Sequence, residues 1–292
     1  LFVVVALIFH QRKMAVILFL VLFGAFLLNL PHLVSIVPQL FSAPDGNEAF
    51  KSGLIFPYGL GFWGPNSHDG LWHVSLINSL IRETPPQNPV FSGEVLKNYH
   101  YFYDLLIAAT NYLSGIPVLD LLFRFYPIIF SLCLGIGTYY LIKLIIKGDT
   151  SSLENRLATL SGLYLVYFAG SFGWIVEYLK MRHLGGESAF WANQSISFNL
   201  NPPFAISLLI VIAILQLLPI VKFNMLTIFV LTIFTGSLIS FKAYGGILIL
   251  LSLLLFAIFK KSYFYLIVFL ISSTLSSILF LSNFSLGKQL II

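Results

Sequence analysis

Long apolar runs separated by short polar segments fill most of this chain of 292 residues, and they restrict its fold more than any other feature. No run alternates like a membrane-barrel strand, and within lipid a helix satisfies its own backbone hydrogen bonds. The sequence predicts an all-α polytopic membrane protein with about seven full transmembrane helices and a truncated one. The runs that could cross a bilayer are 14–31, 121–142, 157–176, 203–221, 225–241, 244–259 and 263–282.

Composition agrees with a membrane protein. Apolar residues make up 58% of the chain and charged residues 9%, against roughly 25% charged residues in a soluble domain. The net charge is +5, but the basic residues are scattered between apolar runs, so we expect no nucleic-acid partner. The single cysteine, Cys133, excludes an intrachain disulfide and a cysteine-based metal cage.

The first apolar segment, 1–9, is too short to cross about 30 Å of hydrocarbon. It is either the end of a truncated span or a signal peptide. The basic residues at 10–13 follow it, whereas a signal peptide carries them in front, so the truncated span is preferred. We expect one transmembrane domain over 1–292, forming the N-terminal part of a longer protein.

Short basic segments predict the orientation. They fall on one side of the membrane if the spans alternate, and the positive-inside rule makes that side cytoplasmic. The first external loop is then 32–120 and the second is 177–202, while the turn 241–246 is also external. We expect a multi-pass integral membrane protein, in the plasma membrane if the protein is prokaryotic, with its active face outside. The basic segments are 10–13, 143–156, Lys222, Lys260 and Lys261.

The segment 101–115 is either a further span or a juxtamembrane helix at the outer surface. It is short and carries Asp104, and a span here would put the basic segment 143–156 outside. An interfacial helix is therefore expected. Its tyrosines suit the lipid headgroup zone: Tyr99, Tyr101, Tyr103 and Tyr112.

The polar stretch 68–104 is where we expect chemistry, because ionisable groups concentrated in one segment of a membrane protein mark either an aqueous segment or a site. Apolar residues recur at spacings of three and four after Asp69, which predicts a helix that ends at Pro85 and Pro86. Asp69 and His73 would share one face of that helix. The run that follows is expected to be extended and to lead to His100 and Asp104.

Asp69, beside His68 and His73, could be a general base, could help to hold a divalent cation, or could only cap the helix. Either histidine could bind substrate or merely form a hydrogen bond at the interface. Asp104 could belong to the same site or cap the following helix. No cofactor is certain from these residues.

Lys97, Tyr99 and His100 are placed to meet a lipid phosphate, although Lys97 and Tyr99 could simply anchor the chain at the headgroups. Arg124, near the outer end of a span, needs a partner or an aqueous face. The second external loop mixes amides with aromatic rings, which suits sugar recognition or any wet loop, and contains Glu187. Lys242 in the turn 241–246 could join the same pocket, as could Tyr244.

No P-loop, GxGxxG, GxSxG or HExxH pattern occurs, so nucleotide hydrolysis and common hydrolase chemistry have no support. The order of features resembles a known superfamily. A first span is followed by an external loop with an acid early in a helix, a PPxNP segment, the aromatic stretch YHYFYDLL and a span with Arg124. This order resembles the GT-C superfamily of membrane glycosyltransferases, which includes relatives of protein mannosyltransferases and of the aminoarabinose transferase.

The resemblance covers roughly 14–146 and implies a function. In that superfamily an acid of an external loop deprotonates the acceptor, and a sugar linked to polyprenyl phosphate is the donor. Asp69 would be the base, Lys97 and His100 would lie near the donor phosphate, and Glu187 would be the acid of the later loop. The pair 68–69 is His-Asp where two acids are common, and no lysine stands beside Pro85.

The resemblance therefore implies membrane lipids and a polyprenyl-phosphate sugar donor as partners, with an unknown acceptor. Two alternatives stay open: a transporter or flippase of lipid-linked sugars, and a non-catalytic membrane scaffold. A transporter predicts ionisable residues within the spans, where only Arg124 offers one.

Overall fold

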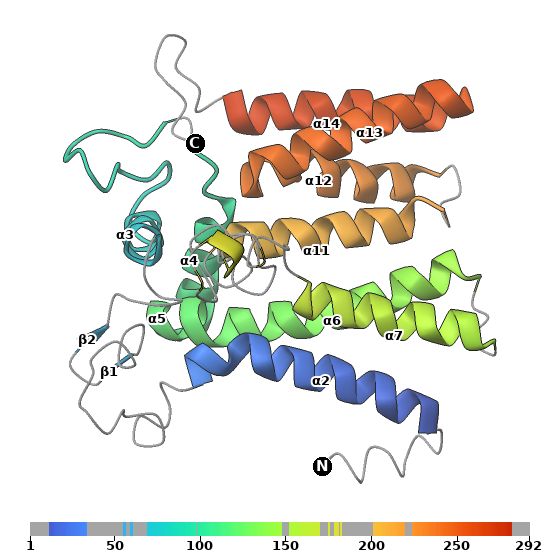
Figure 1. Ribbon diagram of the computed structural model, residues 1–292. Coiled ribbons are helices and arrows are strands. Elements are labelled where there is room, and N and C mark those ends of the chain that lie inside the picture. The colour runs from blue at the N-terminus through green and yellow to red at the C-terminus, as the bar shows by residue number, and fades with distance from the viewer. Residues whose placement is uncertain are drawn as a thin grey trace, which may run out of the picture. The chain divides into compact units, whose positions relative to one another are not determined.

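The computed structural model describes residues 12–33, 55–56, 59–60, 69–97, 99–147, 152–169, 175, 178–180, 182, 201–219 and 224–281 (Figure 1). The chain forms two compact units, each made of segments distant in the sequence. Unit 1 comprises Leu1–His68 and Phe123–Asn201, and unit 2 comprises Asp69–Leu122 and Pro202–Ile292. The boundary at residues 68 and 69 falls within the predicted first external loop.

The described chain is almost entirely helical, as the sequence predicts, and each of the seven apolar runs contains a helix. A short antiparallel pair of strands, β1 (Ile55–Phe56) and β2 (Gly59–Leu60), is the exception among the described residues. The helices are α2 (Arg12–Leu33), α3 (Gly70–Leu80), α4 (Phe102–Ser114), α5 (Val118–Asp120), the π-helix η5 (Leu121–Phe125), α6 (Tyr126–Ile145), α7 (Leu153–Phe168), α11 (Pro202–Leu217), α12 (Met225–Phe241), α13 (Ala243–Lys260) and α14 (Tyr263–Leu281).

Within the described ranges, two helices are long and apolar enough to cross a membrane by length and composition, Val118–Ile145 and Ala243–Lys260. The former joins α5, η5 and α6 end to end. These two helices are consistent with membrane association, and the number of seven spans stays a prediction. The proposed truncated span at 1–9 lies outside the described residues.

Local sequence explains several helix boundaries. The side chain of Ser152 accepts a hydrogen bond from the backbone N–H of Asn155 at 3.2 Å, and so caps α7. Asn224 caps α12 in the same way. Helix α4 ends at Gly115, whose φ of +71° lies in the left-handed region that glycine adopts without strain.

Unit 1 contains α2, α6 and α7, packed around the ring of Tyr167 on α7, which is 1% exposed. The hydroxyl of Tyr167 donates to the backbone carbonyl of Ser131 at 2.7 Å, and Asn29 donates to the Ser131 hydroxyl at 2.7 Å. Two glycines make room for this ring: a Cβ at Gly24 would lie 2.5 Å from it, and a Cβ at Gly135 would collide with the hydroxyl. A side chain at either glycine would therefore displace the Tyr167 ring, which is held by its backbone on α7 and by the hydrogen bond of its hydroxyl to Ser131.

We expect Gly135→Val to lower the free energy of unfolding by about 1–3 kcal/mol, because overpacking forces a buried side chain off its preferred position. The thermal unfolding midpoint in detergent micelles measures the loss. Cys133→Val is the matched control, since it adds a β-branched residue to the same helix at an exposed position. An equal loss in the two variants would contradict the role given to Gly135.

Unit 2 is built on α11, α12, α13 and α14, which run side by side (Figure 1). Helices α12 and α13 approach closely at their connection, where a Cβ on Gly246 would lie 2.7 Å from the backbone of Ile239. Lys242 is the one residue between these helices and has an extended backbone. The core of the bundle consists of Ile214, Leu231, Leu238, Ile249, Leu253 and Val268.

Helix α4 contacts α11 and α12, and its first residue Phe102 meets Phe241, at the end of α12, edge to face at 5.7 Å. Its 13 residues extend over about 20 Å, less than the hydrocarbon thickness of about 30 Å. The expectation of tyrosines at the headgroups is wrong for two of them. Tyr101 and Tyr103 are buried, and the Tyr103 ring meets the His73 imidazole edge to face at 6.0 Å, whereas Tyr112 is exposed.

Helix α3 packs its buried face, formed by His73, Leu76, Ile77 and Leu80, within unit 2. The helix ends at Leu80, earlier than the predicted stop at Pro85. The run after Pro85 is not a simple extended strip. It folds back on itself through pairing of Gln87 with Val95, and Gly93, with φ of +82°, lies at the turn.

Candidate functional site

Five ionisable side chains of unit 2 interact at one end of the bundle, and we call them the charged cluster: Asp69, His73, His100, Asp104 and Lys242. They come from the start of α3, the start of α4 and the α12–α13 turn. Four of them lie in the polar stretch 68–104. The tight α12–α13 turn brings the fifth, Lys242, to them.

A buried hydrogen bond joins α3 to α4. His73 Nδ1 lies 2.7 Å from Asp104 Oδ1, and the two side chains are 3% and 0% exposed. Asp104 stands in the first turn of α4, where the partial positive charge of the helix start favours a carboxylate. It is a partner of His73 and not merely a local cap.

The pKa values of this pair reflect its burial. Burial alone would lower the pKa of His73, but the adjacent Asp104 carboxylate, with help from Asp69, raises it above its ordinary value. Burial raises the pKa of Asp104, and His73 opposes this. A proton held between Nδ1 and Oδ1 leaves the pair uncharged overall, which is the arrangement that burial favours.

Asp69 is partly exposed at the N-terminal end of α3. Its backbone occupies the N-cap position, but its side chain makes no capping hydrogen bond. The capping alternative therefore does not describe this residue. The charge of Asp69 instead favours the protonated forms of His73 and Lys242.

Lys242 and His100 form the second contact of the cluster, with Lys242 Nζ lying 3.4 Å from His100 Nε2. Burial, followed by the charges of Lys242 and His73, lowers the pKa of His100 to about 3. The imidazole is therefore neutral at physiological pH and accepts from the ammonium group. Burial lowers the pKa of Lys242, and Asp69 partly offsets that effect.

Aromatic rings support His100. Tyr99 stacks on the imidazole with centroids 4.7 Å apart and planes at 19°, and Trp72 meets Tyr99 edge to face at 5.5 Å. Lys242 lies 5.5 Å from the centroid of the Tyr244 ring. Sequence reasoning named Tyr99 and suggested Tyr244, but it missed Trp72, whose position one residue before His73 was the available signal.

Other predicted site residues are not part of the charged cluster. Lys97 is exposed, and it forms no ion pair with any residue that the structure describes. Arg124 lies in the π-helix η5 and belongs to unit 1. His68 and Glu187 lie outside the described residues, as does almost all of the second external loop.

The donor set does not fit a divalent cation well. Within the part of the chain that the structure describes, no three side chains among His, Cys, Asp and Glu gather as metal ligands. The Nδ1 of His73 already faces Asp104, and a lysine ammonium stands in the same cluster. The possible cation at Asp69 and His73 therefore gains no support from these residues.

Comparison of the chain with protein-family models, with curated proteins and with solved structures finds no match. The arguments for function therefore depend on the site itself.

The His73–Asp104 pair should make stability fall as pH rises. A folded-state pKa above 6.5 for His73 stabilises the folded chain below that pH, and this stability is lost as pH rises through the folded value. His100 has a lowered pKa, so its contribution changes only below 6.5. We expect the unfolding midpoint to fall as pH rises above 6.5, and to fall less in the double variant His73→Gln/Asp104→Asn. Equal slopes in the two proteins would refute this assignment.

Removing the charge of Lys242 should raise the pKa of His100 above about 3 but not to the ordinary 6.5. Burial, the largest cause of the lowered pKa, remains, whereas the nearby cation that also disfavours the imidazolium is gone. Lys242→Gln, followed by NMR titration of the labelled histidines, measures the shift. Lys97→Gln is the control, since it removes a lysine charge elsewhere in the same unit. An unchanged His100 titration in Lys242→Gln would count against the contact.

Proposed function

We propose that this protein is a membrane-embedded glycosyltransferase that moves a sugar from a polyprenyl-phosphate-linked donor to an acceptor on the external face. The observation that carries the proposal is the charged cluster, in which a carboxylate without a capping role, Asp69, lies within electrostatic range of a lysine, Lys242. The P-loop and GxSxG motifs that many phosphoryl- and acyl-transfer enzymes carry do not occur in the sequence, so those reactions gain no support from it.

The seven-span topology is part of this proposal, and the surface of α13 supports it. One face of this helix packs in the bundle, while seven large apolar side chains elsewhere on it are exposed. Soluble proteins rarely leave so continuous an apolar face in water, whereas hydrocarbon would cover it. The exposed residues are Ile247, Leu248, Leu251, Leu255, Phe256, Ile258 and Phe259.

The position of the cluster along α13 supports an external active face. Lys242 immediately precedes this helix, and Lys260 and Lys261 lie at its far end. The 18 residues of α13 rise about 27 Å, close to the thickness of the hydrocarbon. If the basic pair is cytoplasmic, as the positive-inside rule predicts, the charged cluster lies at the outer surface, where a lipid-linked sugar would be displayed.

In the proposed reaction the Asp69 carboxylate takes the proton of the acceptor hydroxyl. The acceptor oxygen forms a bond to the anomeric carbon of the sugar while the bond from that carbon to the phosphate oxygen breaks. The bonding electrons leave with the polyprenyl phosphate. The ammonium of Lys242 stabilises the negative charge that develops on this phosphate. Lys242 thus takes the role that the resemblance implied for Lys97.

His73 and Asp104 are positioning residues in this scheme. Their bond fixes α3 against α4, and so sets the position of Asp69 at the start of α3. His100 stays neutral and orients the Lys242 ammonium. The buried pair is too enclosed to meet a substrate directly.

The transporter alternative gains less from the structure than the transferase does. Helices α11, α12 and α14 contain no charged residue, and their buried polar groups are hydroxyls, such as those of Thr235 and Ser276. The charged cluster of unit 2 instead lies at one end of the bundle, and Lys260 and Lys261 lie at the other end of α13. A coupled transporter usually needs ionisable groups within its spans.

Asp69→Asn should reduce sugar transfer by about 10²–10⁴-fold with the fold intact, since general-base catalysis contributes that much. The assay uses the full-length protein in membranes, with labelled glucose, mannose, N-acetylglucosamine or aminoarabinose on polyprenyl phosphate, and measures transfer together with release of the lipid phosphate. Glu94→Gln is the control, because Glu94 is an exposed acid outside the cluster.

Transfer by Asp69→Asn at the wild-type rate would remove the base assignment. Absence of transfer by the wild-type protein from all four donors would remove the proposed function with this set of sugars.

A further inference from the structure

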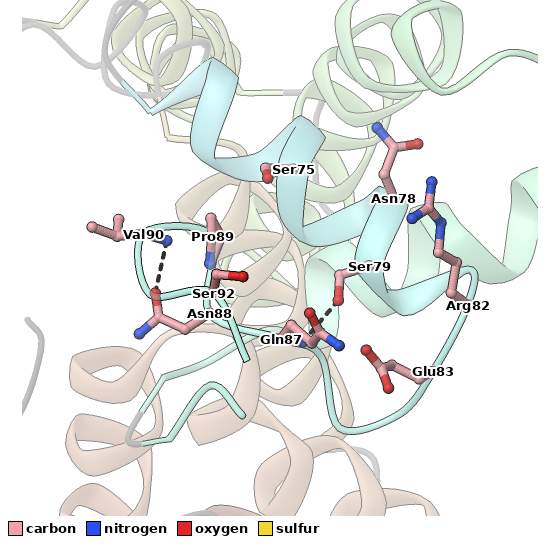
Figure 2. A pocket seen from close by; sticks show the side chains of 10 residues that line it. All are labelled: Ser75, Asn78, Ser79, Arg82, Glu83, Gln87, Asn88, Pro89, Val90 and Ser92. Carbon is pink, nitrogen blue, oxygen red and sulfur yellow. Dashed lines mark hydrogen bonds between the residues drawn. The ribbon is translucent and has the colours of Figure 1, made fainter. Parts of the chain in front are cut away.

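Helix α3 and the loop that follows it enclose a polar pocket with a volume of about 500 Å³ (Figure 2). This volume lies within the roughly 300–1,000 Å³ usual for small-molecule sites. Ser75, Asn78 and Ser79 line it from the helix, and Gln87, Asn88 and Ser92 line it from the loop. The pocket lies entirely within unit 2.

The pocket is separate from the charged cluster. With 100° between successive residues of a helix, Ser75 and Ser79 fall on the side of α3 opposite His73. His73 is buried against the neighbouring helix, whereas Arg82 is exposed. No residue of the charged cluster lines the pocket.

Two hydrogen bonds shape the pocket wall (Figure 2). The backbone N–H of Gln87 donates to the Ser79 hydroxyl at 2.8 Å, and the backbone N–H of Val90 donates to the side-chain Oδ1 of Asn88 at 3.0 Å. The first bond holds the returning loop against α3, and the second fixes a turn within the loop. The side-chain amides of Asn78 and Gln87 remain available, since neither is bonded to another described residue.

The charges of the pocket balance. Arg82 and Glu83 both line it, and no ion pair joins them among the described residues. In Figure 2 the Arg82 guanidinium points toward Asn78, and the Glu83 carboxylate lies toward Gln87. The pocket therefore offers donors and acceptors at separate places without a net charge, which disfavours a strongly anionic or cationic ligand.

We propose that this pocket binds a neutral saccharide. A sugar hydroxyl both donates and accepts, and amides, serine hydroxyls, a guanidinium and a carboxylate supply matching partners of both kinds. Pro89 and Val90 add an apolar wall against which the C–H face of a sugar ring packs. The site does not depend on the transferase reaction, and its ligand is either a soluble saccharide or the headgroup of a glycolipid.

The test measures binding to the full chain in nanodiscs by saturation-transfer NMR. The soluble probes are maltotriose, glucuronate and glucosamine, and a second set of nanodiscs contains digalactosyl diacylglycerol, which should compete with maltotriose if glycolipid headgroups occupy the site. We expect maltotriose to bind better than either charged sugar. Asn78→Leu and Glu83→Gln should each weaken it by about tenfold or more, which is the effect of losing one well-formed hydrogen bond.

Glu94→Gln and Asp69→Asn are the controls and should leave maltotriose binding unchanged. Glu94 lies in the same loop but does not line the pocket, and Asp69 belongs to the charged cluster. Three results would overturn the proposal. The first is maltotriose binding that survives Asn78→Leu and Glu83→Gln, and the second is tighter binding of a charged sugar than of maltotriose. The third is no maltotriose binding in either set of nanodiscs, with or without the glycolipid. Loss of transfer in Asp69→Asn with retained maltotriose binding would separate the two sites.

Discussion

The buried hydrogen bond between His73 and Asp104 is the interaction on which the arrangement of the site depends. A fully buried carboxylate is costly unless it has a partner, and the described structure gives Asp104 an imidazole from a helix 31 residues earlier in the chain. The bond fixes α3 against α4, and it thereby sets the position of Asp69 at the start of α3. Removing one partner would leave the other buried without its hydrogen bond, so site geometry and local stability are coupled here.

The α12–α13 turn is the second constraint. A single residue separates these helices, and Gly246 permits their close approach because any side chain there would meet the backbone of Ile239. Lys242 is consequently held at the end of the bundle, beside His100. An amine on a flexible stem is usually well solvated, but burial lowers the pKa of this one, while Asp69 preserves its charge. The packing of the apolar helices therefore sets the position and the pKa of Lys242 within the charged cluster.

The charged cluster of unit 2 lies at one end of an apolar bundle. The described helices α11, α12 and α14 contain hydroxyls but no charges, whereas the start of α3, the start of α4 and the α12–α13 turn carry the ionisable groups. Such a division suits a protein that works where hydrocarbon meets water, because only there can charged groups and lipid chains each find a favourable environment. The polar pocket on the other face of α3 gathers hydrogen-bonding groups without a net charge, and its proposed ligand is a neutral saccharide.

The sequence by itself determined the helical class, the approximate place of each apolar helix, the start of α3 at Asp69 and the polar stretch that supplies four of the five cluster residues. These features are local, since hydrophobic period, helix propensity and charge are read within a few turns of chain. The sequence did not determine the division into two units, the fold-back of the loop after Pro85, the burial of Tyr103, or the position of Lys242 beside His100. Only the tertiary structure decided these, because they depend on contacts between residues far apart in the chain, such as His73 with Asp104, and no local pattern specifies which buried groups will meet.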